Sequence, residues 1–175
     1  MKLRLTLIAL LFANALPAIA QMQPPKPSPE LKKLDYFVGT WNFSADVKAN
    51  PDSPGGKVTG TEAYNWMDGG FFLAGNSEYI MQGMKTTGPA FMGYDTNDKM
   101  FTYDSYDSVG EATHAKGTFD GTTWTFSSEQ KMGPQTFKGR YTMKVVSPTS
   151  YNLKYEMSPD GANWMTVMEG TATKK

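Results

Sequence analysis

The chain has 175 residues, with 17 basic and 17 acidic side chains, a single histidine and no cysteine. Because the lysines are scattered and form no basic patch, nucleic acid is excluded as an expected partner. The lack of cysteine excludes thiol catalysis, thiolate metal sites and disulfide bonds. A hydrophobic core alone must therefore hold the one domain that this length predicts.

Residues 1–20 have the pattern of a secretory signal peptide. Lys2 and Arg4 precede an apolar run, and Ala18 and Ala20 supply the small side chains that a signal peptidase accepts. The run is shorter than the roughly 20 apolar residues needed to span a bilayer. We therefore expect cleavage after Ala20, a periplasmic or secreted product with a formal charge of −2, and no stable membrane insertion.

A tether and a short helix follow the predicted cleavage site. Residues 21–29 are rich in proline and favour an extended spacer. Ser28 is a suitable cap for a helix whose first turn contains Pro29. The apolar stripe of this helix is formed by Leu31, Leu34 and Phe37. We predict about two helical turns that end at Gly39, within a single domain of residues 30–175.

From Trp41 onward the hydrophobic pattern has a period of two. Tyr141 and Met143 alternate with Thr142 and Lys144, for example, so one face of that strand is apolar and the other is wet. Turn sequences rich in Gly, Asp, Asn and Pro separate such segments at short intervals. The pattern predicts about ten strands, at residues 41–48, 57–67, 70–81, 86–94, 99–107, 111–118, 122–130, 135–146, 150–157 and 163–172.

The short connections between these strands determine the fold class. They leave no room for crossover helices, so neighbouring strands must pair antiparallel as a meander. Closure of the meander removes its two exposed edges. We therefore predict an all-β protein, a closed antiparallel meander β-barrel of about ten strands with one short N-terminal helix. A sandwich of two sheets made from the same strands is the structural alternative.

Several segments, in a fixed order, resemble a known family. Residues 34–41 resemble the Gly-x-Trp motif of calycin barrels, the superfamily that contains lipocalins, fatty-acid-binding proteins and nitrobindins. Residues 92–105, 117–126 and 159–170 are similar to segments of a family of bacterial exported calycin-like proteins of unknown function. The resemblance spans residues 31–175 and implies the barrel fold without an activity.

The resemblance also implies a structural latch at one end of the barrel. In lipocalin-like barrels a basic side chain from the last strand covers the tryptophan of the Gly-x-Trp motif. Gly39 and Trp41 match that motif, and Lys174 or Lys175 stands where an arginine is more usual. A lysine forms a weaker contact with an aromatic face than an arginine does.

The sequence contains no catalytic or metal-binding motif. His114 shares its strand face with Lys116, which predicts a solvent-facing position. Asp104 and Asp107 are three residues apart, so they point to opposite faces of a strand and cannot work as a pair. The acidic turn at residues 95–98 lacks the spaced ligands of a calcium loop. We expect no metal or cofactor, and the sequence favours a binding protein over an enzyme.

Aromatic and methionine residues are abundant, with four Trp, nine Tyr, ten Phe and twelve Met. Such a set either packs a solid core or lines a lumen that takes a small apolar or aromatic ligand. Tyrosine favours the lumen, because a buried hydroxyl needs a partner that water or a ligand can supply. The predicted ligand-binding residues are Tyr64, Trp66, Tyr79, Tyr94, Phe101, Tyr103, Trp124, Phe126, Tyr141 and Tyr155.

Two other functions remain open at this point. A haem protein of the nitrobindin type is one, although those barrels use a histidine near the C-terminal strands and this chain has none there. The other is an envelope interaction protein with a solid barrel that acts through its loops. The volume of the lumen distinguishes a carrier from a solid barrel.

Overall fold

The structure is a computed structural model that describes residues 25–51 and 53–175. The predicted signal peptide and residues 21–24 of the predicted tether lie outside the described residues. The described part of the chain forms one helix and ten strands: η1 (Pro29–Phe37), β1 (Gly39–Val47), β2 (Gly56–Trp66), β3 (Leu73–Met81), β4 (Met84–Asp95), β5 (Met100–Tyr106), β6 (Ala112–Phe119), β7 (Thr123–Met132), β8 (Gln135–Ser147), β9 (Ser150–Ser158) and β10 (Met165–Lys174).

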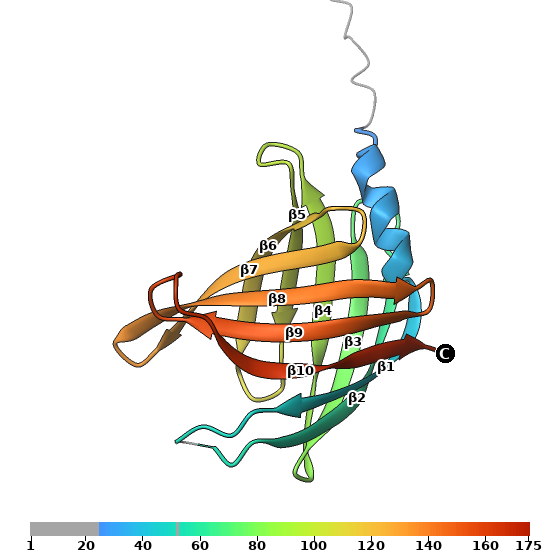
Figure 1. The fold of residues 1–175 in the computed structure, drawn as a ribbon. Coiled ribbons are helices and arrows are strands. Elements are labelled where there is room, and N and C mark those ends of the chain that lie inside the picture. The colour runs from blue at the N-terminus through green and yellow to red at the C-terminus, as the bar shows by residue number, and fades with distance from the viewer. Residues whose placement is uncertain (1–24, 52) are drawn as a thin grey trace, which may run out of the picture.

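The ten strands close into an antiparallel barrel. Each strand pairs with its neighbours in sequence, and β1 pairs with β10 from Trp41↔Lys174 to Val47↔Met168, which closes the sheet (Figure 1). The predicted closed meander barrel with a short N-terminal helix is therefore confirmed, and the two-sheet sandwich is excluded. The inner face is apolar because the hydrophobic residues of each strand alternate with solvated ones.

The helix is a 3₁₀-helix of nine residues. Leu31, Leu34 and Phe37 are spaced by three, which places all three on one face at three residues per turn, and all three are buried. The predicted cap is present, because Ser28 Oγ accepts a hydrogen bond from the Glu30 backbone N–H at 3.3 Å. No helix of the described residues is long and apolar enough to cross a membrane.

Each predicted strand differs from the observed one by at most three residues at either end. The largest difference is at β3, which begins at Leu73 because Gly69 and Gly70 adopt positive φ in the preceding turn. The start of β10 is delayed to Met165 because Asp160 Oδ1 accepts the backbone N–H groups of Ala162 and Asn163. Both turns are set by local features, glycine backbone conformation in one and side-chain hydrogen bonds in the other. The alternation of hydrophobic residues does not report such features.

The two ends of the barrel differ. At one end the chain enters through η1, whose buried face lies against the barrel, and the C-terminus lies at the same end (Figure 1). At the other end the hairpin between β3 and β4 carries Met84, which is 61% exposed. The helix therefore closes the first end, and the second end has no such cover among the described residues.

Candidate functional site

The barrel encloses a cavity of about 460 Å³. Phe37, the last residue of η1, forms part of its wall at the helix end. Val47, Met81 and Met84 line it toward the opposite end, where the exposed Met84 brings the cavity to the protein surface. The cavity is therefore closed by the helix at one end and open to solvent at the β3–β4 hairpin.

Six of the ten predicted ligand-binding residues line this cavity. They come from strands all around the barrel, and they are Tyr64, Tyr79, Tyr103, Phe126, Tyr141 and Tyr155. The alternation of each strand places these side chains on the inner face. The structure brings them together as the sequence predicted, and whether they bind a ligand remains a prediction.

The other four predicted residues lie away from the cavity. Phe101 and Trp124 are buried in the closed end, with ring centroids 4.9 Å apart. Tyr94 packs against Phe101 at 5.0 Å. Trp66 is at the end of β2, and its indole N–H donates to Asp35 Oδ1 of η1 at 2.7 Å. The correct face was predicted for Phe101 and Trp124, but their depth along the barrel places them beneath the cavity.

The three residues assigned to the latch also lie together at the closed end. Trp41 is fully buried, and its Nε1 donates to the Phe37 carbonyl at 2.9 Å, which ties β1 to the helix. Lys174 Nζ lies 5.1 Å from the Trp41 ring centroid, within the range of a cation–π contact. Gly39 adopts a φ of 108°, which only glycine adopts readily between the helix and β1.

One charged residue of the cavity was missed by sequence reasoning. Glu62 lines the cavity and accepts a hydrogen bond from the Tyr79 hydroxyl. Glu62 and Tyr64 are two residues apart on β2, so their side chains point to the same face of the strand. The period of two therefore places Glu62 on the inner face. Glutamate on a strand is normally solvated, which is why the pattern alone did not single it out.

Sequence reasoning also missed the methionines as ligand contacts; five of them line the wall, Met81, Met84, Met92, Met143 and Met168. Their thioether side chains are flexible and polarizable, so they can adapt to the shape of an apolar ligand. Only Met143 was expected to share an inner face with a predicted site residue. For the other methionines, the sequence did not indicate a position in the cavity wall.

Burial and the charge of Glu62 shift the pKa values of the titratable side chains in the cavity wall. Desolvation raises the pKa of Glu62 above its usual value, and the hydrogen bond from Tyr79 partly opposes that shift. Desolvation also raises the pKa of Tyr103 to about 12, with the Glu62 charge as the next cause. The same two causes, in the same order, raise the pKa values of Tyr79 and Tyr141 well above the ordinary range. The tyrosines are therefore neutral donors near neutral pH.

Two glycines make room for the aromatic wall. Gly60 pairs with Tyr79 across β2 and β3, and a Cβ on Gly60 would lie 2.6 Å from the Tyr79 ring. Gly75 pairs with Tyr64 on the same two strands, and a Cβ there would lie 2.3 Å from the Tyr64 ring. Each tyrosine ring therefore lies over a glycine backbone. This close approach explains why glycine stands within strands that otherwise favour larger side chains.

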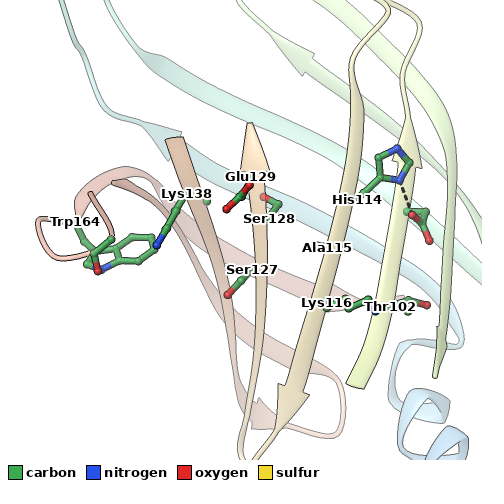
Figure 2. A pocket seen from close by; sticks show the side chains of 12 residues that line it. Thr102, His114, Ala115, Lys116, Ser127, Ser128, Glu129, Lys138 and Trp164 are labelled. Atoms are coloured by element: carbon green, nitrogen blue, oxygen red, sulfur yellow. Dashed lines mark hydrogen bonds and ion pairs between the residues drawn. The ribbon is translucent and has the colours of Figure 1, made fainter. Parts of the chain in front are cut away.

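A second hollow, of about 660 Å³, lies on the outer face of the barrel. Figure 2 shows His114 and Lys116 of β6 on one side of it and Glu129, Lys138 and Trp164 on the other. This groove is open to solvent, and its side chains carry both charges. We place the candidate site in the lumen, because ligand pockets are concave and mostly apolar.

The histidine of the outer groove is solvent-facing, as predicted. Its side chain is 64% exposed, and Nδ1 lies 2.7 Å from Asp104 Oδ1, the contact drawn as a dashed line in Figure 2. Asp107 instead accepts backbone N–H groups of Val109 and Glu111 within a loop. The two aspartates therefore serve separate local contacts and do not form an acid–base pair.

Among the described residues, the histidine is not placed to bind haem in the lumen, and the acidic turn is not open to calcium. His114, which is the one imidazole of the chain, lies on the outer face and cannot reach a haem in the lumen. In the acidic turn, Asp95 and Asp98 both bind Lys116, and Asp95 Oδ1 accepts the Asn97 backbone N–H. An ammonium group therefore occupies the position between these carboxylates.

Solved structures similar to this chain share its barrel fold. The crystal structure of Rv2717c from M. tuberculosis matches with a TM-score of 0.58 and 10% identity, covering 86% of this chain and 99% of that chain. An S-type phycobiliprotein lyase, CPES from Guillardia theta, matches with a TM-score of 0.53 and 10% identity, covering 82% of this chain and 91% of that chain. At such identities the likeness concerns the fold alone.

The family of the chain is established by its sequence. No curated protein matches it. Residues 26–174, which include the helix and all ten strands, match a family described as "Protein of unknown function (DUF1579)". The match covers far more than half of the chain and includes the whole of the closed barrel. The chain therefore belongs to the DUF1579 family of proteins of unknown function.

Proposed function

We propose that this barrel binds one small apolar or aromatic molecule in its lumen. The observation that carries the proposal is the cavity of about 460 Å³, lined mainly by tyrosine, phenylalanine and methionine. Ligand pockets begin at about 300 Å³, whereas a core packed at native density leaves few voids larger than a water molecule. A solid barrel that acts only through its loops has no need of such a cavity.

A residue at the middle of β6 provides a direct test. Ala115 lines the cavity and pairs with Tyr103 on one side and Ser128 on the other, so a larger side chain there would project into the lumen. We expect Ala115→Trp to weaken the binding of the neutral probe N-phenylnaphthylamine by at least about tenfold. The measurement is a fluorescence titration with the purified protein.

His114→Trp is the matched control, because it places the same side chain on the outer face of the same strand. The control should bind the probe like wild type. Thermal unfolding of both variants verifies that each is folded. Undiminished binding to a folded Ala115→Trp variant, or weakened binding to His114→Trp, would place the ligand outside the lumen and contradict the proposal.

We also propose that the protein is exported and acts in the periplasm or outside the cell. The support is the charged start, apolar run and small residues of the first 20 positions. Intact-mass measurement of the protein recovered from the producing cell's envelope or medium should show that residues 1–20 are missing. A product that keeps these residues would contradict export with cleavage after Ala20.

A further inference from the structure

In the described part of the chain, the wall of the lumen contains one charged side chain and no opposite charge. Among the described residues that line the cavity, Glu62 is the only acid, and none is a lysine, an arginine or a histidine. No ion pair of the described residues includes Glu62 either. The cavity is therefore apolar apart from neutral polar groups and one carboxyl group without a basic partner.

Glu62 lies well inside the barrel. It is in the middle of β2, where it pairs with Trp41 on β1 and Ser77 on β3. Its carboxylate accepts the Tyr79 hydroxyl, and its charge acts on Tyr103 and on tyrosines of β8 and β9 across the lumen. A ligand in the cavity would therefore meet this carboxylate together with several neutral hydroxyl groups.

Unpaired burial of a carboxylate is unfavourable, because the charge loses its water and gains no counter-ion. A ligand with a protonated amine supplies that counter-ion and also presents its charge to the tyrosine rings, which attract cations. A ligand with a carboxylate meets a like charge and finds no basic side chain on the wall. The charge of the wall therefore distinguishes between apolar ligands that differ only in their head group.

We propose that the lumen selects small apolar amines in their protonated form, with Glu62 as the counter-ion, over apolar carboxylates such as fatty acids. This inference rests on the proposed binding function and names the class of its ligand. It also assigns a role to a polar residue that a purely apolar carrier would not need.

The affinity for an amine should depend on pH through Glu62. Because burial raises the pKa of Glu62, its carboxyl group stays neutral to a higher pH than that of an exposed glutamate, and the affinity should rise as the pH increases through that pKa. It should fall again when the amine loses its proton. The other titratable groups that face the cavity are tyrosines, which remain neutral over this range: Tyr64, Tyr79, Tyr103, Tyr141, Tyr151 and Tyr155.

Three probes with one apolar body test the inference by isothermal titration calorimetry. They are naphthylmethylamine, naphthylmethanol and naphthoate, which are cationic, neutral and anionic at neutral pH. We expect wild type to bind the amine at least about tenfold more tightly than the carboxylate, with the alcohol between them. In Glu62→Gln the amine should lose about tenfold in affinity, and the alcohol should change less than the amine does.

Glu78→Gln is the matched control, because Glu78 lies on the outer face of β3 and binds Lys85. It should keep the wild-type order of the three probes. Equal binding of amine and carboxylate by wild type, or an amine preference that survives in a folded Glu62→Gln variant, would overturn the inference while the alcohol still reports a functional lumen. If none of the three probes binds wild type, the proposed binding function is itself wrong, and the charge preference is rejected with it.

Discussion

Trp41→Ala is expected to lower the free energy of unfolding by about 3–5 kcal/mol, the usual cost of removing a large aromatic side chain from a core. Trp41 has no exposed surface, and its ring lies 5.2 Å from Tyr36 and 5.1 Å from Tyr151. Its indole N–H also holds the Phe37 carbonyl. The substitution therefore removes packing and a hydrogen bond at the point where the helix joins the barrel. Urea denaturation measures the effect.

One variant is a control for the loss of a tryptophan, and a second variant tests the contact with Lys174. Trp164→Ala removes a tryptophan from an outer loop, where it is partly exposed and contacts Arg140, and should cost much less. Lys174→Met keeps much of the aliphatic side chain over Trp41 and removes the charge, which tests a cation–π contact of about 0.5–1 kcal/mol. A Trp41→Ala variant as stable as wild type would show that this end of the barrel does not depend on the latch.

The fold could be predicted because its determinants are periodic and local. Alternation along each strand identified the inner face, and short turns between strands left only antiparallel neighbours. The boundaries were less accurate at turns fixed by one side chain, such as the carboxylate of Asp160 before β10. Such turns depend on local hydrogen bonds that a hydrophobic pattern does not report.

The site could be predicted only in part, because alternation gives the face of a residue and not its depth. Phe101 and Tyr103 share one face of β5, yet Phe101 packs in the closed end and Tyr103 lines the cavity. Depth depends on which end of the barrel the helix covers, and that is a contact between distant parts of the chain. The same limit applies to Trp124 and Phe126 on β7.

The carboxylate of Glu62 shows a different limit. Its parity on β2 was available from the sequence, but its proximity to Tyr79 depends on the register between β2 and β3 and on the space above Gly60. Neither can be deduced from single-strand periodicity. In a barrel of this kind, a charged residue on the apolar face of a predicted strand is thus the sequence feature that best indicates a polar group in the lumen.

The closed end contains a second tryptophan whose packing differs from that of Trp41 in one testable respect. Trp124 has no exposed surface, and its ring stacks on Phe119 at 4.3 Å and lies 5.1 Å from Phe37. Its Nε1, however, has no hydrogen-bond partner among the described residues. Trp124→Ala should therefore lower the free energy of unfolding by about 3–5 kcal/mol through lost packing alone.

Phenylalanine substitutions distinguish the two tryptophans. Trp124→Phe keeps an aromatic ring and removes an unpaired N–H, whereas Trp41→Phe deprives the buried Phe37 carbonyl of its donor, a loss of about 1–3 kcal/mol. We therefore expect Trp124→Phe to be the milder variant in urea denaturation, and its probe affinity to stay near wild type because Trp124 lies outside the cavity wall. If Trp124→Phe destabilises the barrel as much as Trp124→Ala does, the indole contributes something beyond ring packing, and the unpaired N–H must have a partner in solution.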